Sequence, residues 1–363
     1  MSRARAAGVT GLASAMLALG LHTSATAAVE ARPTDVQQAM QDLVKIDGVV
    51  GAIGELYVDG RRKGQGSAGT RLLGGKGGRI PAASRYRAGS QTKLMTATVV
   101  LQLVKEGKLR LEDTLAAVLP QVARQDLVER AGEITVQQLL RHSSGIPDFF
   151  ASGKFDDAFD FTTSYSPLDL VKASRGVSRT GEPGAGFAYS NTNYVLLGLI
   201  VENVTGRSLS AELERRLFVP LGMRHTYVTT RPPQGIKGPH GHGYHPDAKG
   251  EPRDVDRQNA SFGGAAGGVV STSGDLSAFY RALGQGRLLP ADLRRAVGQP
   301  RPDLCGGTVA AAAGSGPGFL AVTYTSADGR TQLAVSTTLE IDNRQAMPVD
   351  EAMNKAAASV LCP

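Results

Sequence analysis

The order of the predicted elements indicates an α/β fold, in which one antiparallel β-sheet is flanked by helices and carries an inserted all-helical lobe. Two β-rich segments stand near the beginning of the chain and two more near its end, and the residues between them have mainly helical periodicity. Strands from both chain ends can close one sheet, with the intervening helices as a separate lobe. We expect the sheet lobe at about 28–89 and 255–363, and the helical lobe at about 90–254.

The individual elements follow from hydrophobic periodicity and turn signals. Apolar positions that recur every three or four residues predict helices, alternating or β-rich runs predict strands, and Asp-Gly pairs predict hairpin turns. The expected elements are a helix within 28–47, strands over 49–58 and after Asp59-Gly60, helices over 90–106, 134–141, 193–205 and 209–218, a polar excursion over 231–265, a helix over 273–283 with Ser273 as its N-cap, strands over 318–325 and 331–339 around Asp328-Gly329, and a helix over 347–361.

The composition is that of an ordinary globular protein. The 363 residues are 41% hydrophobic and 20% charged, which excludes a disordered or collagen-like chain. The formal net charge is +7, but the basic residues are scattered and have no interleaved aromatic residues, so nucleic-acid binding is not expected. No apolar run reaches the ~20 residues that a membrane span needs, so no membrane span is expected.

The first 27 residues have the pattern of a secretory signal peptide. Arg3 and Arg5 give a positive start, an apolar run follows over 9–21, and Ala25-Thr26-Ala27 has small residues where a signal peptidase cleaves. Residues 28–363 are therefore expected to be the secreted, extracellular protein, with one catalytic domain.

Export also makes the two cysteines interpretable. Cys305 and Cys362 are the only cysteines of the chain, and in an oxidising compartment such a pair is expected to form a disulfide.

The helix that begins at Ser90 carries the first motif with chemical meaning. In Ser90-Gln91-Thr92-Lys93 a hydroxyl and an amine stand three residues apart, on one helix face. A serine becomes a nucleophile when a neighbouring base takes its proton, and a lysine can be that base when burial lowers its pKa. The pattern is common in helices by chance, so taken alone it leaves a purely structural interpretation open.

A second motif, Tyr189-Ser190-Asn191, stands just before an apolar helix. A tyrosine near a lysine can be a second proton carrier, and Asn191 can offer its amide to a substrate carbonyl. Taken alone, a tyrosine at the start of a helix with an asparagine cap is the simpler interpretation.

Together with their surroundings, the two motifs resemble the serine β-lactamase-like, penicillin-binding family. This family includes D-alanyl-D-alanine carboxypeptidases, class C β-lactamases, and related esterases and D-aminopeptidases. The similarity is nearest to secreted actinomycete carboxypeptidases (peptidase S12 type), which carry a disulfide where Cys305 and Cys362 stand. It extends over Arg85-Tyr86-Arg87-Ala88-Gly89-Ser90, 101–109, 134–145, Pro183-Gly184, Ala266-Gly267-Gly268-Val269-Val270-Ser271-Thr272 and the terminal hairpin.

The resemblance implies a monomeric serine hydrolase that works through an acyl-enzyme and needs no cofactor and no metal. Ser90 would attack a carbonyl, Lys93 would accept its proton, and Tyr189 would protonate the leaving amine. The backbone N–H groups of Ser90 and Ser315 would form the oxyanion hole. The substrate would be a peptidoglycan-derived peptide or another small acyl compound, with β-lactams as acylating ligands. The substrate-contacting residues that we expect are Asn191, Phe262, Arg301, Gly314 and Ser315.

The third motif of the family is altered in this chain. Active relatives have Lys-Thr-Gly or His-Thr-Gly, whereas the corresponding positions here are Ala312-Ala313-Gly314. Alanine can neither hold a substrate carboxylate nor support a proton relay. A D-alanyl-D-alanine carboxypeptidase is the leading interpretation. The alternatives are a related esterase or D-aminopeptidase and, from another class, a catalytically impaired penicillin- or peptide-binding module.

Three further features of the sequence carry no predicted chemistry. His240, His242 and His245 have no nearby cysteine or spaced carboxylates, so we expect a solvated loop there rather than a zinc site. The family resemblance implies that His142 is a structural turn residue. Residues 291–304 show no strand pattern.

Overall fold

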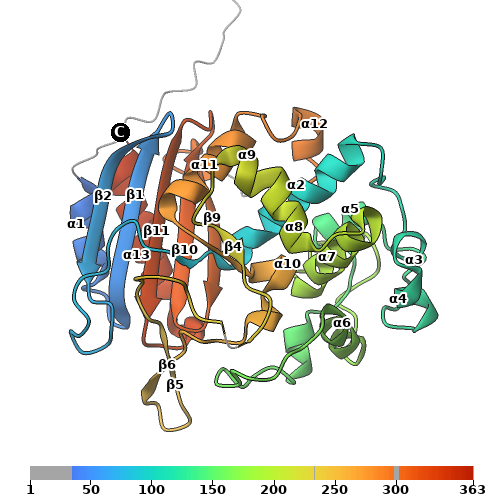
Figure 1. Cartoon of the computed structure of the whole chain (residues 1–363), viewed down its shortest axis with the longest axis horizontal. Coiled ribbons are helices and arrows are strands. Elements are labelled where there is room, and N and C mark those ends of the chain that lie inside the picture. The colour runs from blue at the N-terminus through green and yellow to red at the C-terminus, as the bar shows by residue number, and fades with distance from the viewer. Residues whose placement is uncertain (1–34, 233, 298–301, 363) are drawn as a thin grey trace, which may run out of the picture.

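The computed structural model, which describes residues 35–232, 234–297 and 302–362, has a six-stranded antiparallel sheet beside a lobe of helices (Figure 1). The strand order is β2-β1-β11-β10-β9-β8, so strands from the two ends of the chain meet at the β1–β11 pair. The predicted fold class is therefore confirmed, whereas the predicted signal peptide, residues 1–27, lies outside the described residues. The strands are β1 (Val49–Val58), β2 (Arg61–Gly69), β8 (Pro302–Leu304), β9 (Val309–Gly316), β10 (Phe319–Ser326) and β11 (Thr331–Leu339).

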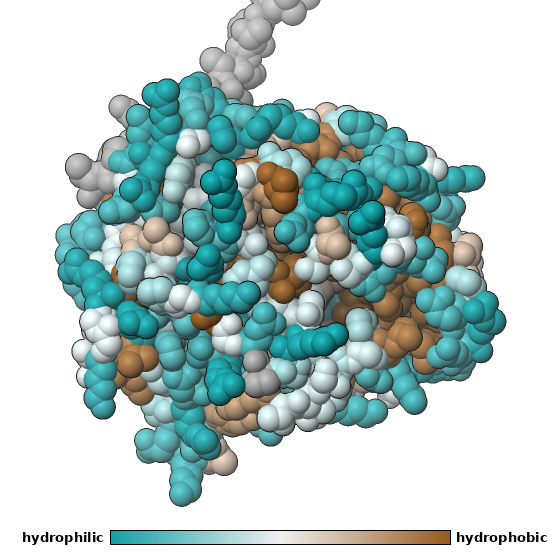
Figure 2. Space-filling view, in the orientation of Figure 1, coloured by the Kyte–Doolittle hydropathy of each residue, from teal (hydrophilic) through white to brown (hydrophobic). Residues whose placement is uncertain are grey.

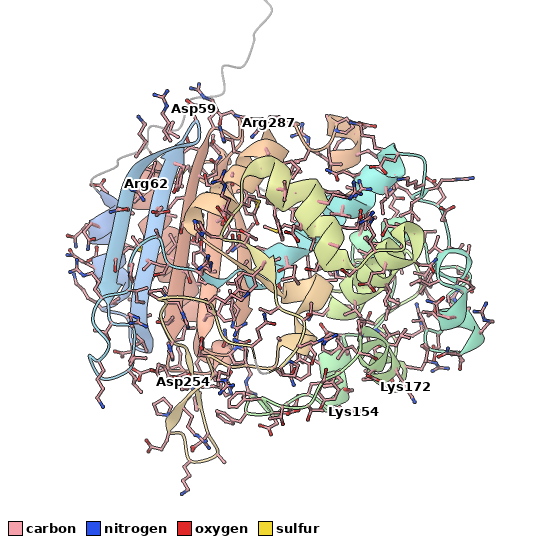
Figure 3. The ribbon with its side chains drawn as sticks, in the orientation of Figure 1. Asp59, Arg62, Lys154, Lys172, Asp254 and Arg287 are labelled. Carbon is pink, nitrogen blue, oxygen red and sulfur yellow. A yellow bond between two sulfur atoms is a disulfide. The ribbon has the colours of Figure 1, made fainter. Side chains whose placement is uncertain are left out.

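The hairpin of β1 and β2 closes through the predicted turn. Asp59 and Gly60 have φ angles of 51° and 77°, the left-handed pair that a two-residue type I′ turn requires. Arg330, directly before β11, places its Nη2 2.6 Å from Asp59 Oδ2. This ion pair ties the two hairpins together at the end of the sheet where Figure 3 labels Asp59.

Helices α1 (Asp35–Leu43) and α13 (Met347–Leu361) cover the outer face of the sheet. The apolar positions that the sequence places on one side of α1, Val36, Met40 and Leu43, are all buried. Gly66 of β2 permits this packing, since a Cβ there would lie 2.5 Å from the carbonyl oxygen of Val36.

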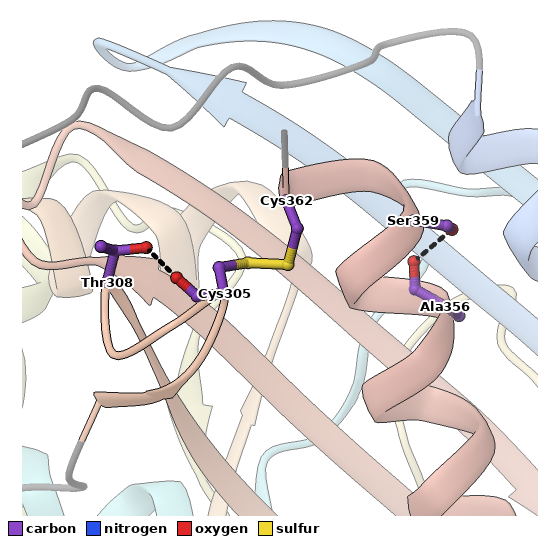
Figure 4. Close-up of a disulfide and its surroundings, with 5 residues drawn as sticks. All are labelled: Cys305, Thr308, Ala356, Ser359 and Cys362. Atoms are coloured by element: carbon purple, nitrogen blue, oxygen red, sulfur yellow. Dashed lines mark hydrogen bonds between the residues drawn. A yellow bond between two sulfur atoms is a disulfide. The ribbon is translucent and has the colours of Figure 1, made fainter.

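A disulfide fastens the end of α13 to the loop after β8 (Figure 4). Cys305 and Cys362 are joined as expected, and the bond closes a segment of 57 residues. A loop of that length is worth about 4 kcal/mol in chain-entropy accounting. Strand β8 was not expected from the sequence, and it pairs only with the start of β9.

The helical lobe is built around two helices, α2 and α7, that are buried on nearly all sides. Figure 2 shows hydrophilic residues over most of this face of the molecule, with hydrophobic residues gathered on the side of the helical lobe. Within the described residues, no helix combines the length and apolar character needed to cross a membrane. The elements of this lobe are η1 (Gly89–Gln91), α2 (Thr92–Lys105), α3 (Leu115–Val118), α4 (Pro120–Arg124), α5 (Val136–Leu140), η2 (Phe149–Ser152), α6 (Pro167–Arg175), α7 (Asn191–Thr205), α8 (Leu209–Leu213), the π-helical turn η3 (Glu214–Phe218), α9 (Val219–Leu221), η4 (Ala260–Phe262), α10 (Gly264–Gly267) and α12 (Ala291–Arg294). The short turn η5 (Asn343–Gln345) lies beside α13 in the sheet lobe.

Helix α11 (Ser273–Gly284) packs against β11 and β1. Its N-cap is Thr272, whose side chain accepts from the backbone N–H of Asp275, so the expectation of a Ser273 cap is wrong by one residue. The Ser273 hydroxyl is instead within hydrogen-bond distance of the carbonyl oxygen of Ala334. A small sheet in the order β3-β7-β4 links the lobes; its strands are β3 (Tyr86–Arg87), β4 (Tyr227–Val228) and β7 (Val269–Ser271).

The polar excursion expected over 231–265 folds back onto the sheet lobe until η4, where it reaches the helical lobe. It contains a hairpin of β5 (Tyr244–Pro246) and β6 (Pro252–Asp254), and the N–H of His242 donates to the carbonyl of Arg71 at 2.9 Å. His240 is only 6% exposed. The expectation of a solvated loop is therefore wrong for this histidine, because its ring lies between the Gly238 carbonyl and the Asp256 carboxylate.

Candidate active site

Ser90 stands in η1, the short turn that leads directly into α2. Gly89 has a φ of +55°, in the left-handed region where glycine is favoured. A Cβ on Gly89 would lie 2.8 Å from the backbone nitrogen of Ser315 in β9. The missing side chain therefore lets the turn that bears Ser90 lie directly against β9.

Lys93 is buried, and three acceptors surround its amine. The Nζ lies 3.2 Å from Ser90 Oγ, 2.7 Å from Asn191 Oδ1 and 2.7 Å from the carbonyl oxygen of Ala266. Burial lowers the pKa of Lys93 from 10.5 to about 7, against the opposing charge of Asp148. A neutral amine has two N–H groups and one lone pair. Because the Asn191 and Ala266 oxygens can only accept, they take the two N–H groups and leave the lone pair for the Ser90 proton.

Tyr189 reaches the same serine from the loop before α7. Its hydroxyl oxygen lies 2.8 Å from Ser90 Oγ, and burial raises the pKa of Tyr189, so the phenol keeps its proton at neutral pH. The ring of His142 stacks on the Tyr189 ring with centroids 4.6 Å apart, while its Nδ1 accepts from the N–H of Ser190. Burial, with the charge of Lys93, lowers the pKa of His142 to about 4. His142 is therefore a neutral support for the tyrosine.

Asn191 is held by a carboxylate that the sequence analysis missed. Asp148 Oδ2 accepts from the backbone N–H of Asn191 at 3.0 Å and from its Nδ2 at 2.7 Å. These bonds turn the Asn191 Oδ1 towards Lys93. No local pattern could have found Asp148, because 43 residues separate it from Asn191.

The backbone N–H of Ser315 is available beside Ser90. A two-residue turn joins β9 to β10, and Gly316 and Phe319 are the hydrogen-bonded pair that closes it. Hydrogen-bonded and non-hydrogen-bonded pairs alternate along an antiparallel ladder, so the next pair, Ser315 with Leu320, is not hydrogen-bonded. The Ser315 N–H therefore points away from β10, towards η1. Gly314 is buried and is not among the residues that line the cleft. A Cβ on Gly314 would lie 2.7 Å from the Ser90 nitrogen, so this glycine lets β9 approach η1.

The reactive groups open into a cleft of about 810 Å³. One wall is aromatic, with Phe150, Phe155 and Phe262 in mutual contact at centroid distances of 5.2 to 6.4 Å. Phe262 thus lines the cleft, whereas Arg301 lies outside the described residues. The aromatic wall can receive an apolar or aromatic substituent of a substrate.

Exposed carboxylates line part of the cleft. Asp156 and Asp157 are exposed there. Among the described residues that line the cleft, Arg87 is buried and donates to backbone carbonyl oxygens, and Arg344 is paired with Asp342. The cleft is lined by three carboxylates, those of Asp156, Asp157 and Asp342, and by two arginines, so the charge at this part of the cleft is negative on balance.

The sequence profile of the family described as "Beta-lactamase" matches residues 36–339. The chain belongs to the beta-lactamase family. A structure titled D-stereospecific amidohydrolase, from a Streptomyces species, is similar with 32% identity and a TM-score of 0.73, and the match covers 89% of this chain and 98% of that one. The D-amino acid amidase of Ochrobactrum anthropi is similar with 25% identity and a TM-score of 0.74, over 90% and 97% of the two chains.

A further similar protein, from Amycolatopsis lactamdurans, is named penicillin-binding protein 4. It is 33% identical over 235 residues, which are 64% of this chain and 59% of that protein. The match thus spans less than two thirds of the length of that relative. The family assignment makes the chain a member of a serine hydrolase superfamily of amidases, β-lactamases and penicillin-binding proteins.

Proposed function

We propose that this protein is an exported serine amide hydrolase that forms an acyl-enzyme on Ser90 and acts on amides or short peptides of D-amino acids with a free amino group. The observation that carries the proposal is the contact of the buried Lys93 amine and the Tyr189 hydroxyl with one serine oxygen. The D-stereochemistry rests on the amidohydrolase and amidase relatives.

The geometry supports a two-step reaction. Neutral Lys93 takes the Ser90 proton while Oγ attacks the carbonyl carbon, and the N–H groups of Ser90 and Ser315 stabilise the oxyanion; such donors are worth about 3 kcal/mol each. Tyr189 protonates the leaving nitrogen as the C–N bond breaks, and the proton held by Lys93 restores the phenol. Water then attacks the ester, with the same groups moving its proton, and regenerates Ser90.

The charges at the cleft support an amine rather than a carboxylate on the substrate. An ammonium group is attracted by the exposed Asp156 and Asp157. The side chains of Ala312 and Ala313, which replace the cation and hydroxyl of the third motif, offer nothing to a carboxylate. The aromatic wall accommodates the side chain of a residue such as D-phenylalanine.

A matched set of amides tests this proposal. We expect ammonia release from D-phenylalanine amide, slower release from the L-amide, and slower release when the D-amide is N-acetylated; Ser90→Ala should abolish all three reactions. Asp156→Asn combined with Asp157→Asn should raise KM for the free amine about fivefold, the equivalent of about 1 kcal/mol at an exposed pair, and leave the acetylated substrate unaffected. A preference for the acetylated amide would contradict the proposal.

A D-alanyl-D-alanine carboxypeptidase is the second candidate, supported by the relative named penicillin-binding protein 4. It is tested with an N-acylated D-alanyl-D-alanine peptide. If the altered third motif limits this reaction, Ala312→His with Ala313→Thr should raise its acylation rate. A binding module without turnover would neither hydrolyse any of these compounds nor become labelled by a fluorescent penicillin.

A further inference from the structure

Four side chains with metal-ligand chemistry meet at the open end of the β5–β6 hairpin. His240 and His242 precede β5. Asp254 is the last residue of β6, where it pairs with Tyr244 of β5, and Asp256 follows two residues later. The two histidines are two residues apart, and so are the two aspartates. Because alternate residues of an extended segment face the same side, all four side chains can face one side of the hairpin. Figure 3 labels Asp254 in this region, at the lower end of the sheet lobe. No local sequence pattern indicates these carboxylates, because they lie 12 to 16 residues after the histidines.

One ligand atom from each of His240, His242 and Asp256 lies within 4.8 Å of the other two. In a tetrahedral site, two ligands that are 2.0–2.2 Å from one Zn²⁺ ion are about 3.3–3.6 Å apart. The three ligand atoms would therefore have to approach one another by at most about 1.5 Å to reach coordination distance. The rings of His240 and His242 are nearly parallel, with an interplanar angle of 7°, so the partly exposed His242 ring must also turn for both nitrogens to face one ion.

Buried His240 is held between two acceptors. Its Nδ1 lies 2.6 Å from the carbonyl oxygen of Gly238, and its Nε2 lies 2.8 Å from Asp256 Oδ1. The carbonyl can only accept, so Nδ1 carries a proton, and Nε2 is the ring nitrogen that faces the carboxylate. Nε2 is therefore the atom that His240 can offer to an ion that Asp256 also binds.

His242 also has a partner that can orient it as a metal ligand once its ring has turned. Its Nδ1 lies 2.7 Å from Asp254 Oδ2, and a carboxylate that accepts from one ring nitrogen leaves the other nitrogen as a directed ligand. One ring nitrogen of His240 contacts a backbone carbonyl, and one ring nitrogen of His242 contacts a carboxylate. Metal-binding imidazoles are usually held by one of these two kinds of partner.

We infer that His240, His242 and Asp256 form a binding site for a divalent transition-metal ion of the Zn²⁺ type, in which Asp254 orients His242. Two imidazole nitrogens with one carboxylate suit such an ion better than Ca²⁺ or Mg²⁺, which prefer oxygen ligands. This inference differs from the sequence-based expectation of no metal, and the titration below distinguishes the two.

The site is structural, because none of its three ligands is among the described residues that line the cleft. It is nevertheless joined to the cleft, since the carbonyl oxygen of Asp256 accepts from Arg87 Nη2 at 2.5 Å. Arg87 stands three residues before Ser90, and Gln258, two residues after Asp256, lines the cleft. A bound ion would thus fix the segment that forms one side of the cleft.

The test is a metal titration of the untagged, chelator-treated full chain. We expect calorimetry to show one Zn²⁺ bound per chain, and Co²⁺ to give the visible absorption of a low-symmetry site with nitrogen and oxygen ligands. His242→Ala should abolish this binding, and Asp254→Asn should weaken it about 10- to 100-fold. His245→Ala, in the same hairpin but outside the cluster, is the matched control and should bind like the native chain.

Two results would overturn the inference: native protein that binds no Zn²⁺ stoichiometrically, or binding that His242→Ala and His245→Ala reduce equally. The native titration decides the question even if a variant fails to fold. Because the readout is metal binding, its outcome is independent of which substrate the Ser90 site hydrolyses.

Discussion

Acylation should be lost as the pH falls through 7, because Lys93 acts only as a neutral amine. Burial lowers the pKa of Lys93 to about 7, so about half of the molecules hold a neutral amine at pH 7 and about one tenth at pH 6. We therefore expect kcat/KM for a p-nitrophenyl ester to fall about tenfold per pH unit below 7. A nitrophenolate leaving group needs no proton, so the acid limb reports the base alone.

Replacing Asp148 by asparagine should move the acid limb of the kcat/KM profile to lower pH. The negative charge of Asp148 raises the pKa of Lys93 against the larger effect of burial, so Asp148→Asn should lower the pKa and shift the midpoint to a lower pH. Asp292→Asn, an exposed site in α12, is the matched control and should leave the midpoint unchanged. A native midpoint above pH 9, or an upward shift in Asp148→Asn, would refute the role given to Lys93.

Three further changes have separable outcomes. Tyr189→Phe should lower kcat for an amide by about 10²- to 10⁴-fold and affect the p-nitrophenyl ester far less; equal losses measured by steady-state kinetics would argue against a role in leaving-group protonation. Gly89→Ala places a Cβ 2.8 Å from the Ser315 nitrogen, so stopped-flow acylation should slow by about 10²- to 10³-fold, and an unchanged rate would exclude Ser315 as a donor. Cys305→Ser with Cys362→Ser should lower the free energy of unfolding by about 4 kcal/mol in urea titrations while kcat/KM stays the same, and a large loss of activity would contradict a purely stabilising disulfide.

The sequence was informative where structure is local. The three-residue spacing of Ser90 and Lys93 predicts their contact because both lie on the first turns leading into one helix. Asp59-Gly60 forms the predicted turn because only residues that tolerate positive φ fit there. The order of strands at the two chain ends likewise sufficed to predict the sheet that they close.

The residues that sequence reasoning missed depend on contacts between distant segments. Asp148 meets Asn191, and His142 stacks on Tyr189, only after the loops before η2 and α7 have packed together. His240 and Asp256 are 16 residues apart, and the β5–β6 hairpin brings them together. The misplaced N-cap has a similar cause, since the Ser273 hydroxyl is engaged by β11 rather than by its own helix.

The most direct measurement is the site of the covalent intermediate. Acid quenching during turnover of an amino-acid p-nitrophenyl ester, followed by digestion and mass spectrometry, should find one acyl group per chain on the peptide that contains Ser90, and none in Lys93→Met under the same conditions. An acyl group on another residue, or acylation of Ser90 at an undiminished rate without Lys93, would contradict a serine activated by this buried amine.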